Sequence, residues 1–163
     1  MTGGQQVTYR KATLKDLDAL MDLWDGLMEY HLDFFPEIYQ FRKGHEKKQQ
    51  KWFSKNIRSK NSFVMLAEVG DTAVGFVMLF VEKFMPSIYI WKKSAVLSDL
   101  FVCEGYRGTG VAKKLYKSAR AFAKRKGADF LQLRADSKNL RANKFYDKMG
   151  TFDYMITKME RLK

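Results

Sequence analysis

The sequence predicts a mixed α/β fold in which helices pack against a central sheet. The first observation is an apolar run over residues 95–103 that leads, through a turn with three glycines, into a long periodic segment. This pattern indicates a buried strand joined to a helix by a tight loop. The second is that strand-like and helix-like segments follow the order β-α-α-β-β-β-α-β-α-β, which is typical of a layered α/β domain.

Length and composition favour one folded domain. The chain has 163 residues, of which 46% are hydrophobic and 15% aromatic, enough to bury a core. Residues 1–6, MTGGQQ, resemble an expression leader, so we expect a disordered leader or tag remnant before a single domain over 7–163. No run of about 18 apolar residues and no secretory signal pattern is present, so we expect no membrane partner and a cytoplasmic location.

The cysteine count and the charge narrow the classes of site and partner. Cys103 is the single cysteine, which excludes an internal disulfide and a multi-cysteine zinc site, and the two histidines do not indicate a metal centre. The net charge of +12 suits nucleic acid, an acidic protein or a polyanionic cofactor. No RNA-binding, helix-turn-helix or zinc-finger motif is visible, so only charge favours nucleic acid, which we do not expect as a partner.

The first part of the chain is predicted to form a strand and two helices. Val7–Lys11 has the pattern of a strand, and Thr13 with Asp16 forms a helix-capping signal. The apolar face of the first helix then consists of Leu17, Leu20, Met21, Trp24, Leu27, Met28 and His31. An aromatic segment with Pro36 separates this helix from a second one, His45–Arg58.

The rest of the chain supplies the other strands and helices. Ser62–Val69 and residues 73–83 are strand-like and are separated by a short hairpin signal. The long helix that follows the central strand is expected to end at Gly127. After it, the pattern predicts a strand over residues 129–135 and a helix over residues 139–149, which Gly150 ends. A final strand is predicted over residues 152–159.

The turn between the central strand and the long helix predicts an anion site. Gly108 and Gly110 let the backbone bend sharply and approach a ligand closely. The helix that follows presents unpaired N–H groups and the positive end of its dipole, which together bind phosphate. Neither the dinucleotide pattern G-x-G-x-x-G nor the Walker pattern is present.

Residues 107–112, RGTGVA, read R-x-x-G-x-A. This resembles the pyrophosphate loop of the GCN5-related N-acetyltransferases (GNAT), whose pattern is Q/R-x-x-G-x-G/A between a central strand and a helix. Asn139, Ala142 and Tyr146 resemble the second motif of that family, in the right order. The resemblance implies a mixed, mostly antiparallel sheet of roughly six to seven strands, flanked by about four helices and splayed at the central strand.

The resemblance also implies acetyl-CoA as the cofactor. The backbone of the central strand would hold the pantetheine arm and the thioester oxygen, and Asn139 would hydrogen-bond the pantetheine, cap its own helix, or do both. The residues expected to bind the cofactor are Leu100, Phe101, Val102, Arg107, Gly108, Thr109, Gly110, Val111, Ala112, Lys113, Asn139, Ala142 and Tyr146.

Two residues are candidates for catalysis. Tyr146 matches the usual general acid of the family, and the alternative is a core aromatic beside Phe145 and Met149. Many members place a glutamate on the central strand, where this chain has Ser98 and Asp99. Asp99 either draws a proton from the amine through water or forms an ion pair or cap, because a carboxylate in an apolar run is costly without a partner or a role.

The acceptor is expected to be a primary amine, in the form of a small amine, a polyamine-like molecule, or an N-terminal or lysine amine of a peptide. The candidate acceptor-binding residues are Trp24, Phe34, Phe35 and Ser98; for Phe34 and Phe35, core and pocket are equal alternatives. The expected reaction is direct attack in a ternary complex, without a metal. The alternatives are an acyl-CoA sensor without activity and a basic nucleic-acid-binding protein, and a homodimer remains open.

Overall fold

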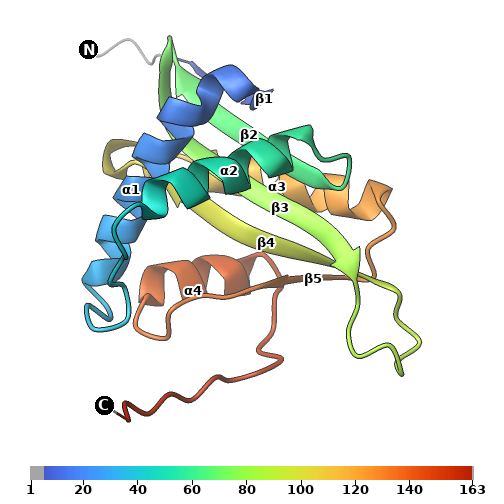
Figure 1. The fold of residues 1–163 in the computed structure, drawn as a ribbon. Coiled ribbons are helices and arrows are strands. Elements are labelled where there is room, and N and C mark those ends of the chain that lie inside the picture. The colour runs from blue at the N-terminus through green and yellow to red at the C-terminus, as the bar shows by residue number, and fades with distance from the viewer. Residues whose placement is uncertain (1–5, 163) are drawn as a thin grey trace.

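The computed structural model describes residues 6–162. Residues 1–5, most of the predicted leader, lie outside the described residues. Two short 3-10 turns, η1 (Leu14–Asp16) and η2 (Glu104–Tyr106), accompany the longer elements. As Figure 1 shows, these are β1 (Val7–Lys11), α1 (Leu17–Leu32), α2 (His45–Arg58), β2 (Ser62–Val69), β3 (Thr72–Lys83), β4 (Lys93–Val102), α3 (Val111–Arg125), β5 (Phe130–Leu133) and α4 (Leu140–Lys148).

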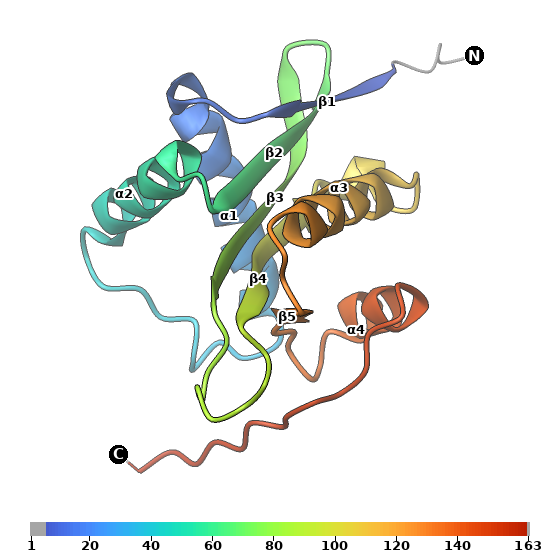
Figure 2. The ribbon, with the colours of Figure 1, turned by 90° about the vertical axis from the view of Figure 1, so that its right-hand side faces the viewer.

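The strands form one sheet in the order β1-β2-β3-β4-β5. The first three pairs are antiparallel, and β4 pairs with β5 in parallel. Seen along the sheet in Figure 2, α1 and α2 cover one face, and α3 and α4 cover the other. Each face has its own apolar core because successive side chains of a strand point to opposite sides. In the described residues, no helix is both long and apolar enough to cross a membrane.

The predicted capping signal forms at the start of η1, the 3-10 turn that leads into α1. The Asp16 carboxylate accepts a hydrogen bond from the backbone N–H of Thr13 (2.6 Å). Arg10 of β1 bridges this carboxylate (2.7 Å) to Glu68 of β2 (2.6 Å). The hydrogen bond from Arg10 lowers the pKa of Asp16. Charge pairing therefore joins the first helix to the strands at the edge of the sheet.

The predicted final strand is wrong, and the sheet formed by residues 6–162 has five strands rather than six or seven. Residues 152–159 leave α4 after Gly150 and form no helix or strand. In Figures 1 and 2 this segment runs below α4 and away from the sheet. A strand requires a neighbouring edge for its backbone hydrogen bonds, and none of the described strands pairs with the tail.

The central strand splays from its neighbour as predicted. Met78 pairs with Asp99 and Leu79 pairs with Leu97, so Ser98 is an extra residue in β4, and a β-bulge forms there. β5 pairs with β4 only along Ser94–Leu97. Beyond the bulge, the edge of β4 on the side of β5 has no strand partner among the described residues, and its backbone groups are open to a ligand.

Gly75 of β3 allows the close approach of β4 at this point. A Cβ atom at residue 75 would lie 2.8 Å from the backbone oxygen of Phe101 and 3.2 Å from Cγ2 of Val102. We therefore expect Gly75→Ala to lower the free energy of unfolding by about 1–3 kcal/mol, because the backbone of β4 must move. Urea unfolding followed by circular dichroism measures the change.

Gly105→Ala is the matched control for this substitution. A Cβ at Gly105 meets no atom within 4 Å, and its φ is not in the left-handed region. We expect a change within about 0.5 kcal/mol for this variant. Equal effects of the two substitutions would show that the contact with β4 does not constrain residue 75.

Candidate active site

The loop between β4 and α3 is open to the outside along its backbone. Gly108 (φ 79°) and Gly110 (φ 94°) both adopt the left-handed conformation, which favours glycine. A Cβ at either position would meet no atom within 4 Å. The two glycines thus bend the chain sharply and leave free space over the loop.

The N-terminus of α3 is arranged to receive an anion. Gly110 is its N-cap residue, no side chain caps the helix, and its first turn contains no acidic residue. The first helical hydrogen bond runs from the N–H of Lys114 to the oxygen of Gly110 (3.0 Å). The backbone N–H groups of Val111, Ala112 and Lys113 therefore have no partner within the helix. By contrast, α2 has Glu46 in its first turn, and Asn139 caps α4.

Arg107 fixes the loop to its surroundings. Its Nε donates a hydrogen bond to the backbone oxygen of Val102 (2.9 Å). Its guanidinium lies 4.7 Å from the ring centroid of Tyr30 on α1 and 5.7 Å from that of Phe101, which is the geometry of a cation–π contact. Thr109 Oγ1 donates to the backbone oxygen of Tyr106 (2.6 Å). The loop is therefore held in shape by its own side chains.

The splayed part of β4 offers backbone groups rather than side chains. Phe101 and Val102 are buried, and they belong to the two different cores of the sheet. Leu100 is half-buried against the core on the α3 side. Their side chains anchor the strand on both faces, so its unpaired edge is rigidly positioned.

Asp99 lies directly after the bulge and is half-buried. Ser98, which is exposed, donates a hydrogen bond from Oγ to the Asp99 carboxylate. Burial raises the pKa of Asp99 to about 6, and the hydrogen bond from Ser98 opposes this shift. Asp99 is therefore ionised at neutral pH but close enough to its pKa to exchange a proton.

Tyr146 on α4 is brought close to Asp99. Burial raises the pKa of Tyr146, and nearby Tyr116 and Asp99 raise it further. The phenol is consequently protonated at neutral pH and can act as a proton donor. Its ring packs 5.2 Å from that of Phe145 and 6.1 Å from that of Tyr116. The two residues predicted for catalysis thus lie near one another where β4 and β5 separate, although they come from different elements.

Asn139 and Ala142 form the start of α4. Asn139 is buried, and its Oδ1 accepts a hydrogen bond from the backbone N–H of Ala142 (3.0 Å). Of the two roles expected for Asn139, capping is thus present in the structure. The cap fixes the first turn of α4 and with it the position of Tyr146 on the same helix.

The predicted acceptor residues fall into different environments. Trp24 is only 8% exposed and lies in the core under α2, with its ring 5.6 Å from Phe41. Phe34 and Phe35 are half-buried in the segment after α1. Phe34 packs edge-on against Tyr30 (5.1 Å), and Lys138 lies 4.3 Å above the ring of Phe35. Ser98 lies at the bulge in β4, whereas these aromatic residues belong to α1 and the segment after it.

A polar cluster that the sequence did not reveal connects the segment after α1 to the loop before α4. Tyr39 Oη donates to both carboxylate oxygens of Asp136 (2.9 and 3.0 Å). His31 Nε2 lies 3.8 Å from the same carboxylate, and its ring stacks on Tyr39 at 4.8 Å. Burial lowers the pKa of His31, and burial and Asp136 raise the pKa of Tyr39 to about 12. Both side chains are therefore uncharged at neutral pH.

One sequence signal could have indicated Asp136. It directly follows the strand predicted over residues 129–135, and polar residues at the carboxyl ends of parallel strands often contact ligands. Tyr39 carries no comparable signal. Its partner lies 97 residues away in the sequence.

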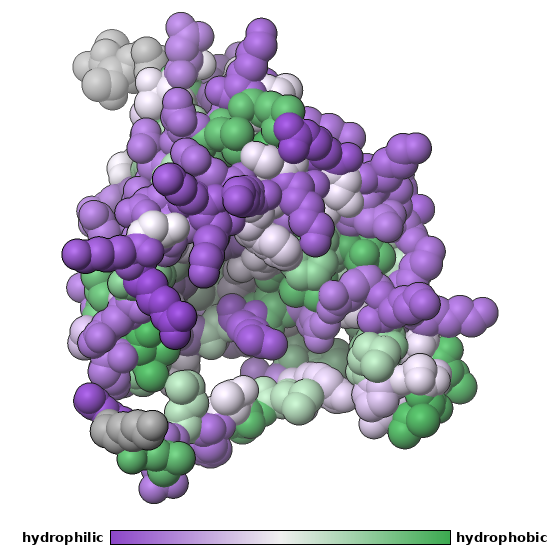
Figure 3. Space-filling model, in the orientation of Figure 1, coloured by the Kyte–Doolittle hydropathy of each residue, from purple (hydrophilic) through white to green (hydrophobic). Residues whose placement is uncertain are grey.

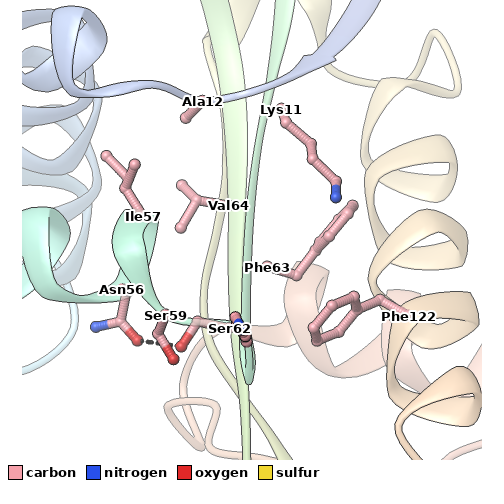
Figure 4. A pocket seen from close by; sticks show the side chains of 10 residues that line it. Lys11, Ala12, Asn56, Ile57, Ser59, Ser62, Phe63, Val64 and Phe122 are labelled. Atoms are coloured by element: carbon pink, nitrogen blue, oxygen red, sulfur yellow. Dashed lines mark hydrogen bonds between the residues drawn. The ribbon is translucent and has the colours of Figure 1, made fainter.

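A cavity of about 140 Å³ lies elsewhere, between α2, the strands β1 and β2, and the end of α3 (Figure 4). In this view Phe63 and Phe122 lie on the side of α3, with their rings stacked at 5.3 Å, and Asn56 and Ser62 are hydrogen-bonded on the opposite side. None of the predicted site residues lines this cavity. Its position separates it from the loop and the splayed strand.

The order of elements, the bulge in β4 and the glycine loop before α3 agree with one family of known proteins. The profile of the acetyltransferase (GNAT) family matches residues 24–151. The chain belongs to the GNAT family. An uncharacterized N-acetyltransferase of Archaeoglobus fulgidus is 32% identical to it over 141 residues, which cover 84% of this chain and 87% of that protein.

Solved structures show the same GNAT fold. A tetramutant of the BH1408 protein from Bacillus halodurans matches with a TM-score of 0.81 at 22% identity, over 95% of this chain and 99% of that chain. Aminoglycoside N-acetyltransferase AAC(6')-Iy in complex with CoA matches with a TM-score of 0.75 at 16% identity, over 99% and 97% of the two chains. The predicted family and fold class are confirmed, with a smaller number of strands.

As a GNAT N-acetyltransferase, the chain uses acetyl-CoA. The residues present fit this cofactor. Its diphosphate requires hydrogen-bond donors without a competing carboxylate, and the uncapped first turn of α3 offers them. The space over Gly108 and Gly110 would be filled by a side chain in any other residue.

Proposed function

We propose that this GNAT enzyme transfers the acetyl group of acetyl-CoA to a primary amine by direct attack in a ternary complex. The observation that carries the proposal is that Asp99 follows the bulge at the open edge of β4 and lies near the buried phenol of Tyr146. One group can donate a proton and the other can accept one at the same pH. This is the requirement for exchanging an amine proton for a thiol proton.

Each part of the site has a separate role in this proposal. Backbone N–H groups at Val111–Lys113 bind the diphosphate, and Arg107 keeps the loop in place. Acetyl-CoA supplies an activated thioester carbonyl. The open edge of β4 at Leu100–Val102 positions the carbonyl oxygen with a backbone N–H, which stabilises negative charge on it.

Protons enter and leave through two side chains. Asp99 accepts a proton from the substrate ammonium through water, because its carboxylate is ionised above about pH 6. Burial keeps the phenol of Tyr146 neutral, so its Oη gives a proton to the sulfur as the C–S bond breaks. The second proton that the attacking nitrogen loses then restores the phenol. Asn139 supports this arrangement by fixing the first turn of α4.

A cationic amine is the acceptor class that the surroundings favour. The carboxylate of Asp136, to which Tyr39 donates a hydrogen bond, lies between the segment after α1 and the loop before α4. Phe34 and Phe35, in the same segment after α1, offer half-buried apolar surface. The aminoglycoside N-acetyltransferase with the same fold supports an amine acceptor.

A thiol-release assay with acetyl-CoA tests this function. The panel contains a simple alkylamine, a polyamine, an aminoglycoside, a peptide with a free N-terminus and a peptide with an internal lysine. We expect thiol release with at least one amine, together with an acetylated product in mass spectrometry. Tight acetyl-CoA binding without turnover on any amine would instead favour the sensor alternative.

The role of Asp99 predicts a pH profile. A base must be ionised, so turnover of the wild type should rise with pH through about 6, the raised pKa of Asp99. Asp99→Asn should lower kcat by roughly 100-fold near pH 7 and remove this rise, since general base catalysis contributes factors of about 10² to 10⁴. Steady-state kinetics from about pH 5 to about pH 9, in steps of about half a pH unit, measures both effects.

Stability separates this role from a structural one. Because the folded protein raises the pKa of Asp99 above 3.8, its contribution to stability is full below that value and is lost as pH rises through about 6. Asp99→Asn should therefore be no less stable than the wild type above pH 6. Ser98→Ala is the companion variant: it removes the hydrogen bond that lowers the pKa, so the rise in turnover should move to higher pH. An unchanged profile in both variants would assign the titration to another group.

A further inference from the structure

The loop between β3 and β4 presents a group of apolar side chains to solvent. Residues 84–92 form no helix or strand, and in Figures 1 and 2 the loop extends beyond the ends of both strands. Met85, Ile88 and Ile90 of this loop are 70–84% exposed. Figure 3 shows hydrophobic side chains over the loop, at the lower right, with hydrophilic side chains directly above them. Exposed apolar groups that gather in one place and are rimmed by polar residues mark a contact surface.

The base of this loop is fixed by hydrogen bonds and aromatic contacts. The backbone N–H of Phe84 donates to the backbone oxygen of Lys92 (2.9 Å), and the backbone N–H of Lys92 donates to the Asp129 carboxylate (2.8 Å). The rings of Phe84 and Trp91 lie 5.8 and 4.9 Å from that of Phe130 on β5. The aromatic side chains at the two ends of the loop therefore pack against the sheet, whereas the aliphatic ones between them stay in solvent.

Lysines surround the base of the same loop. Lys83 ends β3, Lys93 begins β4, and the two residues are paired in the sheet. Together with Lys126, which follows α3, they line a groove of about 170 Å³. Among the described residues that line this groove, Glu82 is the one acid. A cationic groove thus lies next to an apolar tip.

We propose that this loop docks on the surface of an anionic lipid bilayer. Met85, Ile88 and Ile90 enter the boundary between the headgroups and the acyl chains, about 5–10 Å deep, and the lysine groove faces the lipid phosphates. The apolar tip and the cationic base match these two layers of the bilayer. Docking of this kind needs no apolar run long enough to cross the membrane, and the lack of such a run is the reason to expect no membrane partner from the sequence.

Two other occupants match these side chains less well. Single-stranded nucleic acid binds through cations and stacked aromatic rings, so the three aliphatic side chains would stay in water. A second copy of the chain would bring its own lysines to the same apolar tip, and like charges oppose such a contact. An anionic lipid surface accommodates the apolar and the cationic groups together.

Vesicle sedimentation with the full chain tests the apolar part of this surface. The probes are vesicles of phosphatidylcholine alone and vesicles that also contain about 30% phosphatidylserine. We expect the anionic vesicles to bind about tenfold more tightly or better, and we expect the double variant Ile88→Ser/Ile90→Ser to lose about tenfold of this affinity or more. Because both side chains are exposed, circular dichroism and the affinity for acetyl-CoA should not change.

A pair of charge-matched variants tests the lysine groove. Each lysine near an anionic surface strengthens binding by about fivefold, so Lys83→Gln/Lys93→Gln should weaken vesicle binding by about tenfold or more. Lys47→Gln/Lys48→Gln changes the net charge equally at the start of α2, which lies away from the loop in Figure 1. We expect this control to stay within about threefold of the wild type, because salt screens distant charges.

Quenching of tryptophan fluorescence by lipids brominated on their acyl chains reports insertion. The wild type should be quenched, and Trp91→Phe should lose most of this quenching, because Trp24 is buried in the core. Absence of binding to anionic vesicles, or binding that the isoleucine variant does not weaken, would overturn the proposal. Equal losses in the two lysine pairs would do the same, since binding would then depend on net charge alone.

Two further results would assign the loop to another occupant and overturn the proposal. Light scattering that shows a dimer of the wild type and a monomer of Ile88→Ser/Ile90→Ser would mean that a second copy covers the tip. Tighter binding of single-stranded RNA than of anionic vesicles, with the same loss in the groove variant, would assign the groove to nucleic acid.

Discussion

Gly110→Glu is expected to weaken acetyl-CoA binding severely. Gly110 is the N-cap of α3, with φ 94° and free space where a Cβ would lie. A glutamate there would place a side chain and a negative charge in the proposed binding site of the diphosphate. Hydrogen bonds to charged groups are worth about 1.5–3 kcal/mol each. Loss of two of them weakens affinity by roughly 100-fold or more, which isothermal calorimetry measures directly.

Gly44→Glu provides the matched control. Gly44 is the N-cap of α2, it also has a left-handed φ of 75°, and a Cβ there would likewise meet no atom within 4 Å. The two substitutions therefore carry the same backbone strain and the same added charge at a helix start. We expect Gly44→Glu to keep the wild-type affinity for acetyl-CoA. If both variants bind acetyl-CoA normally, the diphosphate lies elsewhere. If both lose binding, backbone strain or added charge lowers the affinity without a specific binding site at the start of α3.

The parts of this site that the sequence predicted well depend on local interactions. The turn at Gly108 and Gly110 and the start of α3 follow from backbone conformations that few residues other than glycine adopt. The capping geometry of Asn139 likewise involves residues within one turn of α4. Short-range patterns of this kind determine the conformation of a loop and the first turn of a helix, and contacts with the rest of the chain are not needed to predict them.

The parts that the sequence did not predict depend on contacts between distant segments. The apolar residues of 152–159 indicate a strand, but strand formation requires a partner edge that periodicity cannot identify. The contact of Tyr39 with Asp136 joins two loops that no local pattern connects. For Trp24, periodicity gave the correct apolar face of α1, whereas only the structure shows that this face is covered by α2 and the loop before it.

The bulge at Ser98 links the fold to the chemistry. The extra residue shifts the register of β4 against β3 and ends its pairing with β5 at Leu97. Asp99 follows directly and is half-buried at this point, which raises its pKa. A single irregularity in the sheet therefore opens the strand edge and places a carboxylate of unusual pKa beside it.

Tyr146→Phe should lower kcat by roughly 100-fold or more while leaving the affinity for acetyl-CoA within about twofold, since general acid catalysis contributes factors of about 10² to 10⁴. The substitution removes only the hydroxyl, and the ring keeps its packing against Phe145 and Tyr116. Because burial holds the phenol neutral, the loss should persist across neutral pH rather than appear as a shifted profile. Steady-state kinetics with the best amine, together with calorimetry of acetyl-CoA, separates turnover from binding.

Tyr116→Phe is the control that makes this result specific. Tyr116 is buried on α3, its ring lies 6.1 Å from that of Tyr146, and burial also raises its pKa. The control thus removes a neighbouring hydroxyl of similar character from the same aromatic group. We expect Tyr116→Phe to retain most of the wild-type kcat, because the proton for the sulfur comes from Tyr146 in the proposed reaction. Equal losses in the two variants would mean that packing in this aromatic group, rather than proton donation by Tyr146, limits turnover.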